Sequence, residues 1–120
     1  MNAYVQAGTP GSSDRWFAEG RYFTIVSFGR GCDGQARRML GQLRGRRVNW
    51  IRSGSGSRDH AALVQAVEEA TVGWRLMLIG AADDVTAARE RALAAGVLAT
   101  EIRTDVVDVP RPFLRQEEYA

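Results

Sequence analysis

The chain alternates between short apolar segments and turns of small or polar residues. Three such segments, residues 22–28, 48–51 and 76–79, each run directly into a turn rich in glycine, serine or aspartate. Short apolar runs that end in turns of this kind are typical of buried strands. A helical pattern follows each turn, so the sequence predicts three strand–turn–helix units in succession.

Apolar residues at helical spacing follow each of the three turns. We expect the first helix to begin at Asp33 and to stop at Gly45, the second to end near Gly73 and the third to end at Gly96. The positions that carry the spacing are Ala36, Met39, Leu40 and Leu43, then Leu63, Val64, Ala66, Val67 and Ala70, and finally Val85, Ala88, Ala92 and Ala95. Helices that connect short buried strands predict a parallel sheet.

Polar residues stand at the expected starts of the second and third helices. Ser57 or Asp59 suits the cap of the second helix, and Asp83 or Asp84 suits the cap of the third. Short oxygen-bearing side chains are favoured there because they accept the free N–H groups of a first helical turn. Asp83 and Asp84 also fit a metal or general-base pair, and capping is the interpretation that we favour.

The residue pattern over positions 98–107 predicts a fourth strand, which is less apolar than the first three. With right-handed crossovers, the simplest strand order is 2-1-3-4, an open parallel sheet with helices on both faces, as in Rossmann-like α/β proteins. We therefore expect an irregular arm over residues 1–20, one α/β domain over residues 21–107 and an extended tail over residues 108–120. Ligands of such sheets bind at the carboxyl ends of the strands.

Length and composition limit the kind of protein. A chain of 120 residues with 45% hydrophobic residues suits a single domain with a proper core. It contains no lysine, which excludes a lysine Schiff base and a P-loop lysine. Its single cysteine, Cys32, excludes an internal disulfide framework and a cysteine-rich metal site, so no metal is expected. Neither a signal-peptide pattern nor an apolar run of about 20 residues is present, so we expect a cytoplasmic protein with no membrane partner.

Charge is distributed unevenly, although the net charge is only +2. Residues 1–58 hold ten arginines and three acidic residues, whereas residues 59–120 hold six arginines and eleven acidic residues. Such polarity steers an anionic nucleotide or an acidic redox partner toward the first half, and a solvated arginine-rich helix face is the alternative. Nucleic acid is not expected as a partner, because the clustered arginines are split between helix and turn without interleaved aromatic residues. These are Arg37, Arg38, Arg44, Arg46 and Arg47.

The turn after the first strand is the strongest candidate for a binding site. Its sequence contains Gly29, Arg30, Gly31 and Gly34 in a GxGxxG spacing that follows a strand and opens a helix. Glycines allow close backbone approach, and the N–H groups at a helix start point toward a bound anion such as a pyrophosphate. The alternative is that the glycines only relieve steric crowding in the turn.

The turn after the second strand carries Arg52, Ser53 and Arg58 among glycines and serines. An acidic residue normally closes the second strand of a dinucleotide-binding unit, and Arg52 stands there instead. An arginine is compatible with a 2′-phosphate, and hence with NADP, because a cation replaces the acid that binds the ribose. The alternative is an ordinary flexible loop.

Two further residues have chemistry that a site could use. The helix start and Arg30 are expected to lower the pKa of Cys32, which a nucleophilic or redox role would require. No base accompanies this cysteine, because His60 is the only histidine and is expected near the start of the second helix. We therefore interpret both as structural residues and assign no catalytic residue.

Four segments carry a resemblance to a known group of proteins. They are residues 48–54 (VNWIRSG), 63–67 (LVQAV), 72–80 (VGWRLMLIG) and 87–97 (AARERALAAGV). In this order they resemble the nucleotide-binding module of the ferredoxin-NADP-reductase-like superfamily. Within it they are most similar to the small reductase-like subunit of dimethylamine monooxygenases. The resemblance extends over residues 20–107.

The resemblance implies a cofactor and a mode of action. Reductases of the superfamily carry a flavin-binding barrel, for which this chain has no room, so we do not expect electron transfer by the chain alone. The superfamily's Cys-Gly-Pro appears here as Ile79-Gly80-Ala81, and Gly80 is expected to face the nicotinamide. NADPH or a flavin nucleotide, bound non-covalently, is the implied cofactor.

Two functions follow as hypotheses. The first is a reductase-like accessory subunit of a multi-subunit oxidoreductase, a monooxygenase or N-demethylase, with larger oxygenase or reductase subunits as partners. The second is a structural subunit that stabilises such chains without binding a nucleotide. The extended apolar strip over residues 106–114 favours the second, since such strips commonly dock on a partner.

Overall fold

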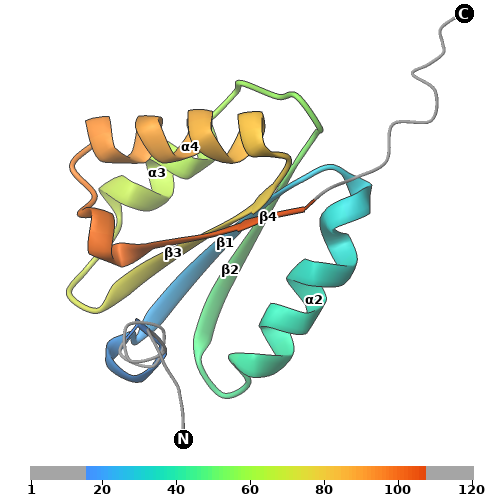
Figure 1. The fold of residues 1–120 in the computed structure, drawn as a ribbon. Helices are drawn as coiled ribbons and strands as arrows, with labels where there is room; N and C mark the ends of the chain where they lie inside the picture. Colours follow the sequence, from blue (N-terminus) through green and yellow to red (C-terminus); the bar gives the residue numbers. More distant parts are fainter. Residues whose placement is uncertain (1–15, 108–120) are drawn as a thin grey trace, which may run out of the picture.

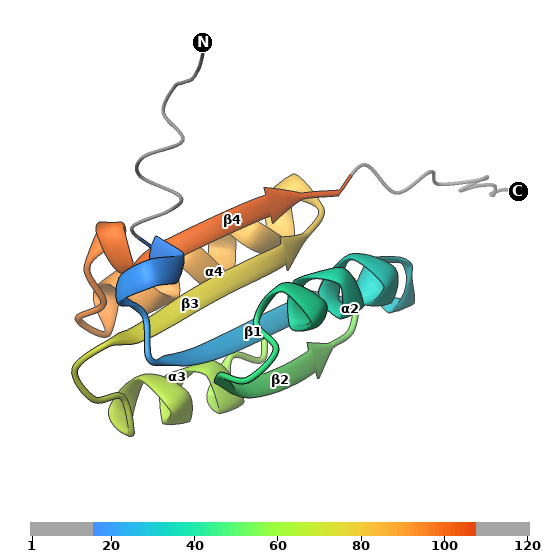
Figure 2. The same ribbon diagram turned by 90° about the horizontal axis from the view of Figure 1, so that it is seen from below.

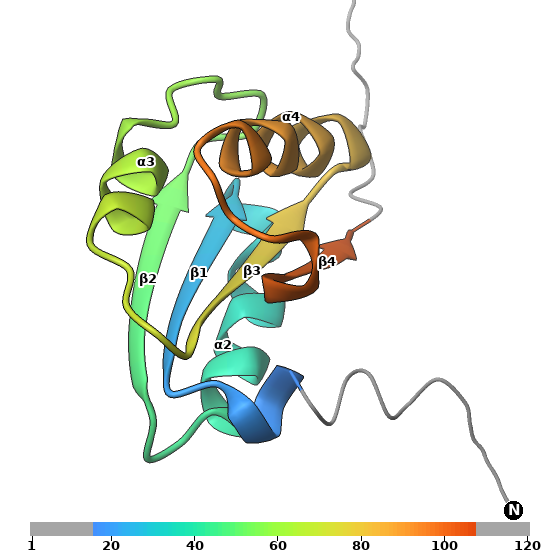
Figure 3. The same cartoon turned by 90° about the vertical axis from the view of Figure 1, so that its left-hand side faces the viewer.

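The computed structural model describes residues 16–107 and contains one sheet of four parallel strands. The strands are β1 (Tyr22–Phe28), β2 (Arg47–Ser53), β3 (Trp74–Gly80) and β4 (Ile102–Val106). Their order is β2-β1-β3-β4, and the arrowheads of β2, β1 and β3 lie together at one edge of the sheet in Figure 3. The predicted α/β fold and strand order are confirmed.

Helices cover both faces of the sheet. The helix α2 (Asp33–Gln42) lies on one face, and α3 (Ala61–Glu68) and α4 (Ala82–Ala94) lie on the other (Figures 1 and 2). Two short 3₁₀ helices, η2 (Arg30–Cys32) and η3 (Ala99–Glu101), precede α2 and β4. The fold is therefore a three-layer sandwich with the sheet in the middle.

The central strand β1 contributes to two separate hydrophobic cores. Phe23 and Ile25 pack on the α2 side, while Val26 and Phe28 pack on the side of α3 and α4. Side chains alternate between the faces of a strand, so a strand covered on both faces must be apolar at nearly every position. This is why residues 22–28 form an almost unbroken apolar run.

Two hydroxyl groups interrupt the apolar character of β1, and each has a partner. The indole Nε1 of Trp74 donates to Thr24 Oγ1 at 3.0 Å, and that of Trp50 donates to Ser27 Oγ at 2.9 Å. Buried polar groups without partners are costly, so these bonds make the two hydroxyls tolerable in the core. Both tryptophans therefore tie a neighbouring strand to β1.

The ends of the described chain differ from the sequence-based expectations. Residues 98–101 were expected to be strand, but β4 begins only at Ile102 and η3 precedes it. The Leu98 N–H donates to the Glu101 carboxylate at 3.0 Å, and the Glu101 N–H returns a bond to the Leu98 carbonyl at 2.9 Å. This closed turn takes the place of the first strand residues.

Part of the predicted arm belongs to the body of the domain. Residues 16–19 are helical, and the buried Trp16 donates from Nε1 to the Glu101 carbonyl at 3.1 Å. Trp16 also packs on Phe23 at a ring-centroid separation of 5.1 Å, on the same face as α2. The remainder of the arm and the predicted tail over residues 108–120 lie outside the described residues.

Candidate functional site

The candidate site lies at the carboxyl edge of the sheet, where the turns after the strands meet. β1 and β3 are neighbours, yet α2, which follows β1, and α3, which precedes β3, lie on opposite faces. Between these two strands the order of the sheet reverses, and in open α/β sheets such a point forms the ligand crevice. The first turn leaves β1 at this point.

Gly29 is required by the shape of the first turn. Its φ is +97°, in the region that favours glycine, and its N–H donates to the Ser53 carbonyl at 2.7 Å. A Cβ at this position would lie 3.2 Å from the Cβ of Ser55. The first and second turns are thus in contact, as a shared ligand site requires.

The other predicted residues of the first turn are exposed. Arg30 and Gly31 lie in η2, and Gly34 lies in the first turn of α2. A Cβ on Gly34 would meet nothing within 4 Å, so packing within the protein does not require a glycine there. The space beside Gly34 is therefore open.

Arg52 is held by a carboxylate from α2. Its Nη2 lies 2.6 Å from Asp33 Oδ2, and its guanidinium lies 5.2 Å from the ring centre of Trp50. The Arg52 side chain is 56% exposed, and the pair uses one of its five N–H donors. Other donors of Arg52 therefore remain available to a phosphate.

Arg58 is held by a carboxylate from α4. Its Nη1 lies 2.8 Å from Asp84 Oδ1, and the other oxygen of Asp84 accepts the Gly56 N–H at 3.1 Å. Asp84 is 3% exposed and does not cap its own helix, whose cap position is Ala81. The capping prediction for Asp84 is thus wrong, because the carboxylate turns toward the loop after β2. Asp83, in the same first turn, is exposed and makes no side-chain cap bond either.

Asp59 lies one residue before the cap position of α3 and bonds to the first residue of the helix. Its Oδ1 accepts the Ala61 N–H at 3.1 Å, while Ser57 Oγ accepts the N–H of Asp59 at 3.2 Å. The residue at the cap position itself is His60, and its side chain makes no capping bond. Neither Ser57 nor Asp59 is thus the cap residue, although Asp59 accepts the N–H of the first helical residue and Ser57 holds Asp59.

The structure separates the residues that were expected to share one 2′-phosphate. Arg52 is bound to α2 and Arg58 to α4, and these helices cover opposite faces of the sheet. Ser53 lies between them and uses its carbonyl to bind Gly29. Arg52 is on the face of the predicted pyrophosphate turn, and Arg58 is not.

Gly80 closes β3 and is buried against β1. A Cβ there would lie 3.0 Å from the Cβ of Phe28, which explains the glycine by close packing. Its carbonyl accepts the Val107 N–H at 2.8 Å. Its role opposite a nicotinamide stays a prediction.

Cys32 has the reactivity of a structural cysteine. It is fully buried, and its Sγ donates to the Phe28 carbonyl at 3.3 Å. Burial raises the pKa of the thiol above its ordinary value, and the carboxylates of Asp33, Asp84 and Asp105 raise it further. The expectation of a lowered pKa is wrong, because burial, the largest cause, disfavours the thiolate and the nearby carboxylates act in the same direction.

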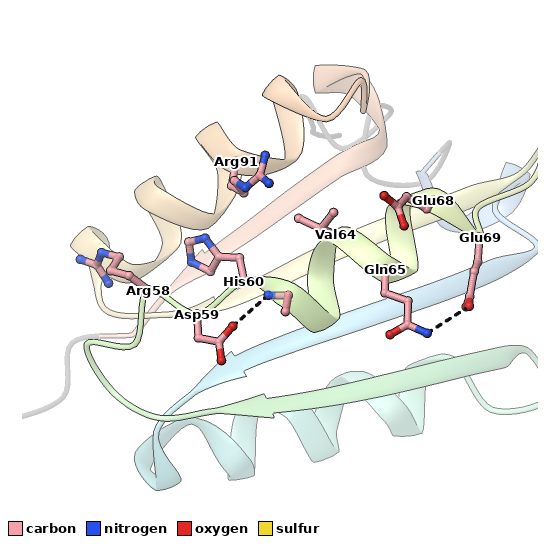
Figure 4. Close-up of a pocket in the computed structure, with 9 residues that line it drawn as sticks. Arg58, Asp59, His60, Val64, Gln65, Glu68, Glu69 and Arg91 are labelled. Carbon is pink, nitrogen blue, oxygen red and sulfur yellow. Dashed lines mark hydrogen bonds between the residues drawn. The ribbon is translucent and has the colours of Figure 1, made fainter.

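Sequence reasoning missed a groove between α3 and α4, shown in Figure 4. It has a volume of about 690 Å³ and is polar along most of its length. Arg58 and His60 line it from the loop and the start of α3, and Arg91 lines it from α4. Arg91 lies in the last turn of α4, and no sequence pattern connects it with the start of α3.

Comparisons with known proteins identify no relative. No family model matches the chain, and neither a curated protein nor a solved structure matches it. Within residues 16–107, no group of three or more histidine, cysteine, aspartate or glutamate side chains is arranged to hold a metal ion. In the same range, every helix is too short or too polar to cross a membrane.

Proposed function

We propose that the chain is an accessory subunit of a multi-subunit oxidoreductase and binds NADPH or a flavin nucleotide at the carboxyl edge of its sheet. A monooxygenase or N-demethylase in the cytoplasm is the assembly that the family resemblance favours, with larger oxygenase or reductase subunits as partners. Neither nucleic acid nor a membrane is a partner in this proposal.

The observation that carries the proposal is the contact between the turns after β1 and β2, beside the point between β1 and β3 where the order of the sheet reverses. The Gly29 N–H bonds to Ser53, so the glycine turn and the end of β2 form one surface. Arg52 extends from that surface toward the start of α2, with guanidinium donors to spare. A helix start next to an arginine suits a phosphate group.

The proposal requires Asp33 to share Arg52 with the ligand. The Asp33 carboxylate lies in the first turn of α2, where its charge is favourable in the free protein. A phosphate arriving there competes with this carboxylate for the same positive end of the helix. We therefore expect modest affinity, and tighter binding when Asp33 is neutralised.

The chemistry of the reaction is assigned to the partner subunits. Among the described residues, Cys32 is buried with a raised pKa, and His60 lies on the opposite side of the sheet from α2. A nucleophile needs an adjacent base to be activated, and the described part of the chain offers no such pair. The chain's part in catalysis is to bind and position the nucleotide.

The structural-subunit alternative is favoured by the β4 edge of the sheet. Within the described residues, β4 pairs with β3 alone, and Val106 at its end is 56% exposed. Leu98, just before η3, is 63% exposed. An unpaired strand edge beside apolar side chains is a surface on which another chain can add a strand.

Titration of the purified full chain with NADPH, FMN and FAD separates the two functions. We expect saturable quenching of tryptophan fluorescence by one of them, since Trp50 lies against Arg52. Replacing Arg52 by glutamine is expected to weaken binding about tenfold, the usual cost of a charge-assisted bond. R47Q, at the opposite end of β2, is the matched control and should bind as the wild type does. Absence of binding by the chain and by its purified complex would leave only the structural role.

A further inference from the structure

The groove between α3 and α4 is polar at both ends, and the two ends differ in charge. Arg58 and Arg91 stand around His60 at the start of α3. Glu68 and Glu69 stand at the end of the same helix. The groove is thus electrically polarised along its length.

Two arginines, Arg58 and Arg91, are the charged neighbours with the largest effect on His60, and Arg58 is itself paired with Asp84. Burial lowers the pKa of the His60 imidazole, and the positive charges of Arg58 and Arg91 lower it further. Asp59, whose carboxylate accepts the Ala61 N–H, acts in the opposite direction with the smallest effect. The ring of Phe28, 6.3 Å away in an edge contact, adds no charge.

The imidazole also lacks a hydrogen-bond partner. Its Nε2 is buried, and no protein group in the described part of the chain binds it. A buried polar atom left alone is costly, and most such atoms in proteins have partners. The arrangement therefore combines two cations with a titratable ring that no protein contact satisfies.

We propose that the His60 end of this groove binds a single oxyanion, a phosphoryl or carboxyl group, of a small molecule. Arg91 lines that end from α4, and Arg58 lines it from the loop after β2. Arg58 is paired with Asp84 through Nη1, but its side chain is 51% exposed, so its other guanidinium donors can hold an anionic group together with Arg91. The glutamates at the far end repel further negative charge, so the ligand carries one anionic group and not a chain of them. This site does not depend on the proposed nucleotide site, which lies on the α2 side of the sheet.

The single histidine of the chain makes the proposal directly measurable. In the full chain prepared without a histidine tag, the imidazole carbon and proton resonances belong to His60 alone. We expect inorganic phosphate to shift them saturably at constant ionic strength, and to raise the pKa of His60, because a bound anion offsets the field of the two arginines. Acetate in a parallel titration distinguishes a carboxyl from a phosphoryl ligand.

Two variants of α4 decide whether the binding is specific. Replacing Arg91 by glutamine is expected to weaken phosphate binding about tenfold. R89Q removes the same charge from the same helix at a position outside the groove, and should leave the binding unchanged. Equal weakening in both variants would overturn the proposal, since it would show general screening of the positive field.

Other outcomes also bear on the proposal. Loss of the His60 shift in R91Q, with circular dichroism as in the wild type, supports the site. No saturable shift with phosphate or acetate overturns it. Tighter binding of tripolyphosphate than of phosphate also overturns it, because the acidic end would then have no effect. NADPH binding detected by tryptophan fluorescence without a His60 shift leaves the two sites independent, as proposed.

Discussion

Two arginine–aspartate pairs lie at the carboxyl edge, and their aspartates differ in burial and in hydrogen bonding. Arg52 and Asp33 meet on the α2 side, where the Asp33 side chain is 15% exposed and binds only the guanidinium. Arg58 and Asp84 meet on the α4 side, where the Asp84 side chain is 5% exposed and also holds a backbone N–H of the loop. The two arginines are similarly exposed, so the pairs differ in the aspartate: Asp33 holds only a side chain, whereas Asp84 also anchors the loop after β2.

Neutralising Asp84 should have the largest effect on stability. In D84A, the Gly56 N–H and Arg58 both lose their partner, and we expect the free energy of unfolding to fall by about 2–3 kcal/mol. The half-exposed Arg58 can still reach water, which keeps the loss below that of a fully buried pair. Urea denaturation followed by circular dichroism measures it. If D84A lowers the free energy of unfolding by less than D33A does, the pair of Asp84 with Arg58 is not the stronger anchor, contrary to our assignment.

Replacing Gly29 should have the next largest effect on stability. Alanine at a φ of +97° is strained, and its Cβ would crowd Ser55, so we expect G29A to lose about 1–2 kcal/mol. G34A is the matched control, since this helical glycine has open space around it and alanine there should gain about 0.5 kcal/mol. If G34A also abolishes nucleotide binding, the ligand must come close to the backbone of α2 at Gly34. Equal stability of G29A and the wild type would argue against the turn geometry.

Neutralising Asp33 should change stability little. The pair with Arg52 is half exposed, and exposed ion pairs contribute about 0–1 kcal/mol, less at high salt. D33N should therefore unfold within that range of the wild type, while its affinity for a phosphate-bearing nucleotide increases because the competing carboxylate is gone. A fluorescence titration beside the urea curve measures both. Weaker nucleotide binding in D33N would show that Asp33 orients Arg52 for the ligand.

The carboxylates of both pairs raise the pKa of Cys32, so this pKa can be used to detect the loss of either charge. Burial is the main cause of its raised pKa, and Asp33 and Asp84 both contribute, Asp33 more strongly. We expect D33N and D84N each to lower that pKa, measured by the ultraviolet absorbance of the thiolate. C32A provides the blank.

The same shift predicts a pH dependence of stability. The folded state disfavours the thiolate and so favours the protonated thiol of Cys32. The contribution of this thiol to stability is complete below the ordinary thiol pKa of 9.0 and is lost as the pH rises through the raised pKa of the folded state. This loss should be absent in C32A. An equal alkaline loss in both proteins would place its cause elsewhere.

The fold was predictable where one physical effect dominates. β1 is buried on both faces, so its apolar run was unambiguous, and the glycines and serines after each strand marked where the elements end. β4 is an edge strand with a mixed pattern, and its first expected residues form η3 because Leu98 and Glu101 bond to each other. Periodicity carries no information about such a local exchange of hydrogen bonds.

The site was predictable only in part. The sequence indicated which residues surround the carboxyl edge, since that follows from the order of the elements. It did not indicate that Arg52 and Arg58 point to different faces, because their partners are 19 and 26 residues away along the chain. Pairing between distant side chains depends on the tertiary structure, so a cluster of arginines in one loop is weak evidence for one anion site.

The central strand also determines how the domain opens. β1 forms one wall of both cores, and it pairs with β2 and β3 along its whole length or nearly so. Neither helical layer can come away without exposing a face of this strand, so the layers are coupled into one cooperative unit. Amide hydrogens of β1 and β3 should accordingly exchange with solvent only through global unfolding. Those of β2 and β4, the edge strands of the described sheet, should exchange earlier through local opening.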